Sequence, residues 1–155
     1  MKFIAYTDGS YDMNDLVGSS AVIVLNSDES KILYTWAKAR KCKYNPEKKQ
    51  RTNEQEMGAA IRAVMSVPKG SRLVIYSDSQ YVVNVLGGMW DANSNLDLIE
   101  RYFNEIQERK VSCTLIWVKG HSGVKYNEMA DDLCNRIAND FRNGKPAIYE
   151  TKNNC

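Results

Sequence analysis

Short apolar runs separated by polar stretches dominate the first third of the chain. Phe3–Thr7, Ala21–Leu25 and Ile32–Trp36 are rich in apolar or β-branched residues, and Gly, Asp, Asn and Ser fill the intervals. This pattern is typical of strands joined by turns, and Gly9 falls in the first expected turn. Because the connections are short, the three segments are expected to form an antiparallel meander.

From residue 57 onward the spacing changes to that of amphipathic helices. Apolar residues within 57–65 recur at i, i+3, i+4, i+7 and i+8, which predicts a helix that ends near Pro68. The compact apolar run Leu73–Tyr76 then predicts a buried strand. A helix between two strands indicates a crossover, which would lay this strand parallel to an earlier one.

The remaining pattern predicts three more helices and one more strand. One helix is expected from Val82 to a stop near Gly87-Gly88, and others over Ile99–Ile106 and Tyr126–Phe141, with a fifth strand over Thr114–Val118. Residues 143–155 lose the pattern and are interpreted as a tail of uncertain order. The order βββαβααβα predicts an α/β domain over residues 1–142, with a mixed five-stranded sheet and helices on both faces.

Composition narrows the class of protein. The chain has 155 residues, 43% of them hydrophobic and 26% charged, which suits one globular domain. It has neither a signal-peptide pattern nor an apolar run of about 18 residues, so a cytoplasmic protein without a membrane partner is expected. With one histidine and widely spaced cysteines, free thiols are expected rather than a zinc site. The four cysteines are Cys42, Cys113, Cys134 and Cys155.

The net charge is only +2, but basic residues gather in one segment. Between residues 38 and 51 there are seven basic residues and a single acid, Glu47. This basic cluster could bind phosphates, or it could be a solvated loop that aids solubility, and the pattern favours neither. Its members are Lys38, Arg40, Lys41, Lys43, Lys48, Lys49 and Arg51.

Two aspartates follow apolar strands directly. Asp8 comes directly after the first apolar run, and Asp78 follows Leu73–Tyr76 with one residue, Ser77, between them. If the two strands are parallel neighbours, about 4.8 Å apart, both carboxylates lie at the strand ends where ligands bind in α/β sheets. Like charges at that distance repel unless a cation lies between them. The alternative is that Asp8 begins an Asp-Gly turn and Asp78 caps the next helix.

Two further acids and the single histidine could also have ordinary structural roles without a function in a site. Glu56 lies in the first turn of a predicted helix, where the helix dipole favours an acid, and Asp131 could be a plain flanking charge in the last helix. Four oxygen ligands without a thiol would favour magnesium or manganese. His121 lies in a loop between Gly120 and Gly123, where it could carry protons or simply face solvent.

Five segments, in order, resemble the type 1 ribonuclease H family over roughly residues 3–140. They are Thr7–Ser10, Glu56–Ile61, Ser77–Val82, Trp117–Gly123 and Asn127–Asp131. The resemblance implies a ribonuclease H-like fold and an endonuclease that hydrolyses the RNA strand of RNA–DNA hybrids. It also implies two-metal-ion catalysis, products with 5′-phosphate and 3′-hydroxyl ends, and a monomer.

The resemblance also implies roles for single residues. It assigns two Mg²⁺ ions, with Mn²⁺ as a substitute, to four catalytic acids, which are Asp8, Glu56, Asp78 and Asp131. It makes His121 an auxiliary catalytic residue. Three neutral amides would contact the 2′-hydroxyl that distinguishes RNA from DNA. These amides are Asn14, Asn53 and Gln80.

Departures from the family pattern leave alternatives open. The turn that holds Asn14 lacks the usual Gly and Pro, and the segment before Glu56 is one residue short, so the match of Asn53 could slip by one. No basic protrusion follows the second helix, and we therefore expect the basic cluster to supply phosphate contacts. The competing functions are a hybrid-binding module with little or no activity, a related metal-dependent DNA nuclease or resolvase, and a generic α/β binding module.

Overall fold

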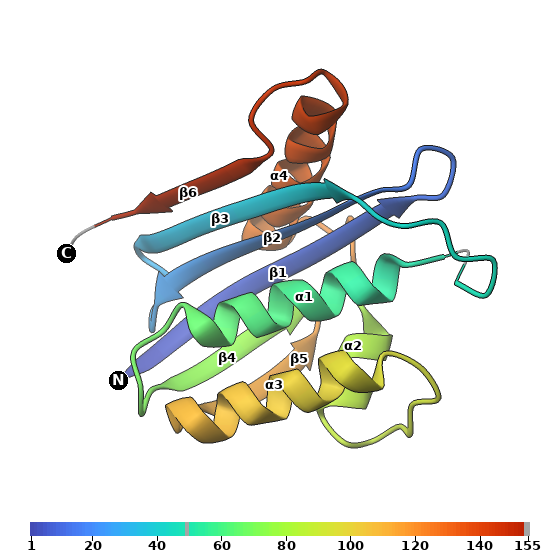
Figure 1. Cartoon of the computed structure of the whole chain (residues 1–155). Helices are drawn as coiled ribbons and strands as arrows, with labels where there is room; N and C mark the ends of the chain where they lie inside the picture. Colours follow the sequence, from blue (N-terminus) through green and yellow to red (C-terminus); the bar gives the residue numbers. More distant parts are fainter. Residues whose placement is uncertain (49, 154–155) are drawn as a thin grey trace.

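The first three strands form the predicted antiparallel meander, but each is longer than its apolar run (Figure 1). In the computed structural model, which describes residues 1–48 and 50–153, they are β1 (Lys2–Asp12), β2 (Val17–Asn26) and β3 (Ile32–Lys41). β1 pairs with β2 as far as Asp12, opposite Val17. Gly9 therefore lies inside a strand, and its assignment to a turn was wrong. The turn occupies residues 13–16 instead.

The second part of the chain follows the predicted crossover. α1 (Thr52–Met65) leads into β4 (Arg72–Ser77), which pairs in parallel with β1. After α2 (Gln80–Leu86) and α3 (Leu96–Arg109), β5 (Ser112–Trp117) pairs in parallel with β4, and α4 (Lys125–Arg142) follows. The strand order is β5-β4-β1-β2-β3-β6. The mixed sheet and the order of elements up to α4 are confirmed.

The expected five-stranded sheet has a sixth strand. β6 (Ile148–Lys152) pairs antiparallel with β3 at the edge of the sheet. It lies within the tail whose order the sequence left open. Most of its side chains are exposed, so its pattern lacks the apolar alternation of a half-buried strand. Backbone bonds from Ala39 N–H to Ala147 O, 2.9 Å, and from Asn153 N–H to Leu33 O, 2.9 Å, flank its pairing.

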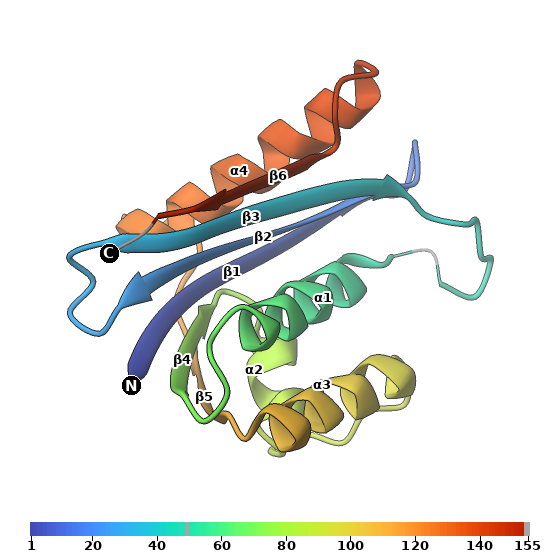
Figure 2. The same cartoon turned by 60° about the vertical axis from the view of Figure 1, so that its left-hand side comes forward.

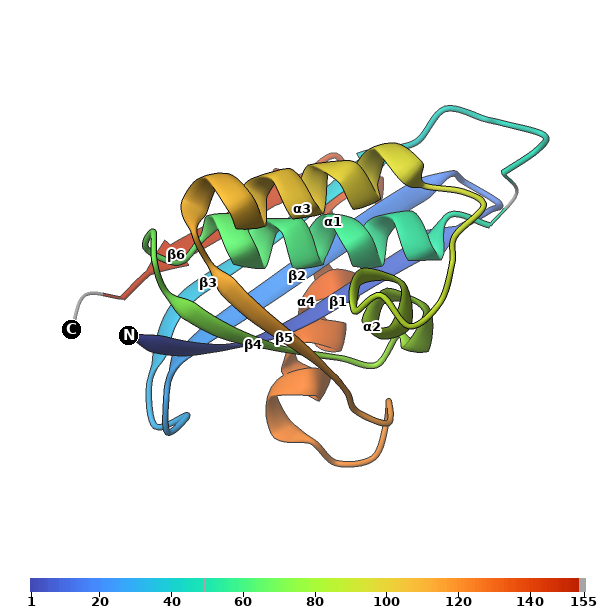
Figure 3. The ribbon, with the colours of Figure 1, turned by 90° about the horizontal axis from the view of Figure 1, so that it is seen from below.

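Helices cover both faces of the sheet, as predicted. α4 packs on β1, β2 and β3 from one side, and α1 packs on β1 and β2 from the other (Figure 2). α3 lies beside α1 (Figure 3), on the side of that helix away from the meander (Figure 2). The largest apolar core fills the space between the sheet and α1, α2 and α3. Among the helices of the described residues, none has the length and apolar character that a membrane crossing needs.

Candidate active site

Asp8 and Asp78 lie toward the same end of the sheet, Asp8 on β1 and Asp78 directly after its parallel neighbour β4. Thr7 of β1 pairs with Ser77 of β4, so the residue after each of them faces the same end of the sheet. β1 continues past Asp8, which rules out the Asp-Gly turn. Ser79 caps α2 by accepting a hydrogen bond from Val82 N–H at 3.1 Å, which rules out Asp78 as the cap. Neither aspartate has the ordinary role that the sequence allowed.

Glu56 reaches the same place from α1 because β1 lets this helix approach very closely. A Cβ atom at Gly9 would lie 2.4 Å from the backbone nitrogen of Glu56, so a larger residue there would push α1 away. The Ser20 hydroxyl donates to the carbonyl of Gln55 at 2.8 Å and anchors the first turn of α1 against β2. Gly9 and Ser20 thus hold the first turn of α1, with Glu56, close against β1 and β2.

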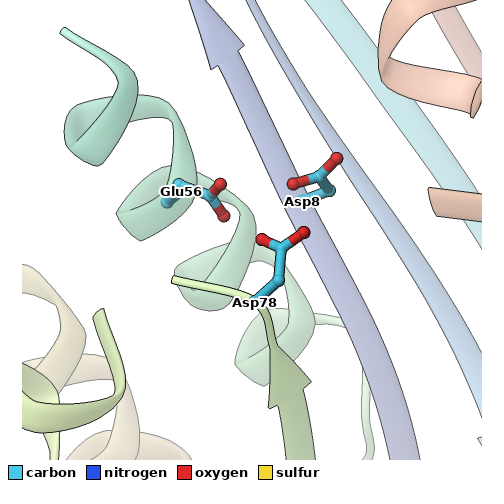
Figure 4. Close-up of side chains that lie close together, drawn as sticks. All are labelled: Asp8, Glu56 and Asp78. Atoms are coloured by element: carbon cyan, nitrogen blue, oxygen red, sulfur yellow. The ribbon is translucent and has the colours of Figure 1, made fainter. Parts of the chain in front are cut away.

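The carboxylates of Asp8, Glu56 and Asp78 point toward one another (Figure 4). One oxygen of each lies within 4.8 Å of the others. Asp8 is 4% exposed and Glu56 is 5% exposed. Burial, and then the charge of Asp78, raise the pKa of Asp8 to about 8. Burial, and then the charge of Asp8, raise the pKa of Glu56 well above its usual range, and burial raises that of Asp78.

This arrangement suits a divalent cation. Oε2 of Glu56 is buried without a hydrogen-bond partner among the described residues, and a buried oxygen in that state costs free energy. Three converging carboxylates repel one another unless a positive charge lies between them. Oxygen donors without thiol or imidazole in the innermost group favour a hard cation of the magnesium class. The residues present therefore fit a divalent metal.

Asp131 lies beside this group on α4. It is not among the three carboxylates that converge within 4.8 Å. Its negative charge nevertheless raises the pKa of Asp8 and that of Asp78. The site therefore has a tight group of three acids and a fourth acid at its border.

The loop with His121 packs directly on Asp78. A Cβ atom at Gly120 would lie 3.1 Å from Oδ2 of Asp78, tighter than ordinary contact. Trp117 Nε1 donates to the backbone carbonyl of Asp78 at 3.2 Å. His121 is exposed with a φ of 54°, a conformation that histidine tolerates better than most residues. Its charge lowers the pKa of Asp78, so the imidazole lies near the carboxylates.

The three proposed substrate-binding amides are all exposed. Asn14 lies in the β1–β2 turn, where its backbone N–H donates to Oδ1 of Asp12 at 2.8 Å. Asn53 is the second residue of α1 and Gln80 is the first residue of α2. α1 carries Glu56, and α2 begins shortly after Asp78. Asn53 and Gln80 therefore lie at the same end of the sheet as the carboxylates. Their contacts with substrate stay predictions.

The described members of the basic cluster differ in their contacts. Lys38, Arg40 and Lys41 are exposed on β3 and Lys43 is exposed beyond it, and Arg40 lies 3.4 Å from Glu54. The guanidinium of Arg51 instead donates to both carboxylate oxygens of Glu54, at 2.9 and 2.6 Å, and to the carbonyl of Lys43 at 2.8 Å. It is therefore a poor candidate for a phosphate contact. Lys49 lies outside the described residues.

Sequence reasoning missed two residues of the site. Asn127 is 1% exposed, its Oδ1 has no hydrogen-bond partner in the described chain, and its side chain lowers the pKa of Asp78. Gly120 provides the close contact between the histidine loop and Asp78. A polar residue in the first turn of a helix and a glycine in a loop give no distinct signal on their own. Cys42, Cys113 and Cys134 are free thiols, as expected, and Cys155 lies outside the described residues.

The chain is similar to known ribonucleases H over most of its length. The RNase H family model matches residues 1–139. A ribonuclease H from Jannaschia sp. (strain CCS1) is 34% identical, and the match covers 92% of this chain and 94% of that protein. A ribonuclease H from Francisella tularensis subsp. novicida (strain U112) is 31% identical, with 87% and 90% covered.

Solved structures show the same fold. The N-terminal RNase H domain of Rv2228c from Mycobacterium tuberculosis, solved as a fusion with maltose binding protein, gives a TM-score of 0.74 at 19% identity, with 92% of this chain and 97% of that chain covered. RNase H1 from the archaeon Halobacterium salinarum NRC-1 gives 0.71 at 22% identity, with 90% and 99% covered. The sequence matches, together with this likeness of fold, show that the chain belongs to the RNase H family.

Proposed function

We propose that this ribonuclease H is an endonuclease that hydrolyses the RNA strand of RNA–DNA hybrids by two-metal-ion catalysis. The observation that carries the proposal is the convergence of three carboxylates within 4.8 Å, with a fourth acid beside them. Asp8, Glu56 and Asp78 would hold one Mg²⁺ ion, and Asp8 with Asp131 would hold the second. When bound, such ions activate the attacking water, stabilise the leaving oxygen and neutralise charge on the scissile phosphate.

The protein's own groups supply positioning and proton transfer. Asp8 is central because it interacts with each of the other three acids. His121 is exposed on its loop near Asp78 and can carry a proton between the site and solvent. Asn53 and Gln80 would contact the 2′-hydroxyl of the RNA strand, and Asn14 would contribute from the β1–β2 turn. The products would carry 5′-phosphate and 3′-hydroxyl ends.

Cleavage of an end-labelled RNA–DNA hybrid tests this proposal. With Mg²⁺ the wild type should cut only the RNA strand, and Mn²⁺ should substitute. Asp78→Asn and Asp131→Asn should abolish or strongly reduce cutting, because each removes a proposed metal ligand. Asp132→Asn is the matched control, since Asp132 is the exposed neighbour of Asp131 on the same helix. Digestion with a phosphatase identifies the 5′-phosphate end.

The outcomes separate the competing functions. A folded wild type that binds the hybrid but does not cut it with either metal would favour a hybrid-binding module. Cutting of duplex DNA would favour a related DNA nuclease or resolvase. Loss of activity in the Asp132→Asn control as well as in Asp131→Asn would remove the specific role that we assign to Asp131.

A further inference from the structure

A groove runs along α1 on the face of the sheet that this helix covers. It has a volume of about 290 Å³, and its walls come from β3, α1 and α3. Four cations and one acid, Glu54, line the part of it that the described residues form. The cations are Lys38, Arg40, Arg62 and Arg101.

Two of these cations are held in place by their neighbours. The guanidinium of Arg62 lies 5.0 Å from the ring centroid of Trp36, donates to the Tyr34 hydroxyl at 2.8 Å, and lies 3.4 Å from Glu150. Arg40 lies 3.4 Å from Glu54, whose carboxylate is already bound more closely by another arginine at 2.6 Å. Each of these two arginines therefore has a carboxylate 3.4 Å away, and Glu54 divides its charge between Arg40 and a second arginine.

The other two cations are free. Lys38 on β3 and Arg101 on α3 are both exposed, and neither takes part in an ion pair or side-chain hydrogen bond within residues 1–48 and 50–153. They lie on opposite walls of the same groove. Exposed, unpaired cations on both walls suit a polyanion that lies along the groove, because each charge can then meet a separate phosphate.

The groove begins close to the carboxylates. Lys38 pairs with Ser20, and Ser20 pairs with Gly9, the neighbour of Asp8. Two strand spacings separate Lys38 from Gly9, or about 10 Å. From there the lining residues follow α1 from Glu54 to Met65, about 16 Å of helix axis. That length equals about five nucleotide steps of a duplex at 3.4 Å each.

We propose that this groove binds the phosphates of a nucleic-acid duplex that extends beyond the carboxylate site, and so anchors the enzyme on one side of the cleavage point. The inference rests on the proposed function, because it assumes that a hybrid occupies the carboxylates. It goes beyond that function by assigning Arg62 and Arg101, which lie outside the basic cluster, to substrate binding. It also predicts a directional dependence on substrate length.

A hybrid with one fixed cleavage point tests the proposal. The substrate strand is DNA with a short central RNA segment, and the duplex is extended on one side or the other by about ten base pairs, twice the length that the groove spans. Binding is measured by fluorescence anisotropy over a range of salt concentrations, with Asp78→Asn in every protein to prevent cutting. Lys38→Gln/Arg101→Gln is compared with the control Lys2→Gln/Lys69→Gln, whose lysines are exposed and outside the groove.

The proposal predicts that extension on one side tightens binding and that extension on the other side does so much less. Lys38→Gln/Arg101→Gln should lose this advantage, and its plot of log affinity against log salt on the extended hybrid should flatten by about 1.8, since each lost phosphate contact contributes about 0.9. The control should keep both properties. Equal behaviour of the two double variants, or equal effects of extension on either side, would overturn the groove proposal. Failure of the wild type to cut any hybrid would instead overturn the proposed function.

Discussion

Removing one charge from the carboxylate group should stabilise the metal-free protein at neutral pH. The change is Asp8→Asn, which keeps the shape of the side chain and removes its negative charge. Burial and neighbouring acids raise the pKa of Asp8 from its ordinary 3.8 to about 8. The folded state therefore holds this proton more tightly than the unfolded state does, and the free energy of unfolding must fall as pH rises between those two values.

The structure sets the size of this effect. A rise from 3.8 to about 8, at about 1.4 kcal/mol for each pH unit, gives an upper limit of about 6 kcal/mol. Relaxation of the site and entry of water reduce such energies, so about 1–3 kcal/mol is expected, as for most single substitutions. The raised pKa values of Glu56 and Asp78 act in the same direction.

Urea unfolding in EDTA, measured at intervals from about pH 5 to about pH 8, tests the prediction. The wild type should lose stability across this range, and Asp8→Asn should lose less and be the more stable protein at the upper end. Added Mg²⁺ should reverse the order, because metal bound at 100 times its Kd adds about 2.7 kcal/mol to the wild type. Asp132→Asn should follow the wild type throughout. A wild type with constant stability in EDTA, together with a less stable Asp8→Asn, would refute the reasoning.

Three further predictions concern packing, the loop and the basic cluster. Gly9→Ala should lower stability by about 1–3 kcal/mol in thermal unfolding, because its Cβ would lie 2.4 Å from Glu56 N, whereas Gly58→Ala, with 3.8 Å to its nearest atom, should be neutral or stabilising. His121→Asn, which tolerates the positive φ, should reduce the cleavage rate tenfold or more and change its pH profile, and an unchanged profile would remove the proton-carrier role. Replacing the four lysines between residues 41 and 49 with Glu should weaken hybrid binding and flatten its salt dependence, and an unchanged salt slope would contradict a phosphate contact there.

The sequence predicted the helices and the crossover because their periodicity reflects burial on one face. It underestimated the strands because β1 and β2 continue through small and polar residues near the site. Ser19, Ser20 and Asp8 are buried although they are polar, since α1 and α4 cover both faces there. A pattern of apolar residues does not predict a strand whose buried positions are occupied by polar residues of a functional site. β6 was not predicted for the opposite reason, because almost none of its side chains is buried.

The ends of two apolar runs and the start of a predicted helix suggested that Asp8, Asp78 and Glu56 lie close together, but each acid kept an ordinary alternative, and it was the resemblance that grouped them. The resemblance named Asp131 as well, but only the structure shows that this acid stands at the border of the group. Charge alone could not show that Arg51 is bound to Glu54 or that Arg62 and Arg101 share a groove with Lys38. Those relations depend on residues far apart in the chain.

The site is possible because glycines stand where its elements meet. Three carboxylates within 4.8 Å come from β1, α1 and the end of β4, and elements with ordinary side chains between them could not approach so closely. Gly9 removes the side chain between β1 and α1, and Gly120 removes it between the histidine loop and Asp78. The repulsion that results is a cost in the metal-free protein, which the large core beneath α1 must outweigh. A divalent cation relieves this repulsion when it binds. The geometry that destabilises the metal-free protein therefore increases its affinity for the metal.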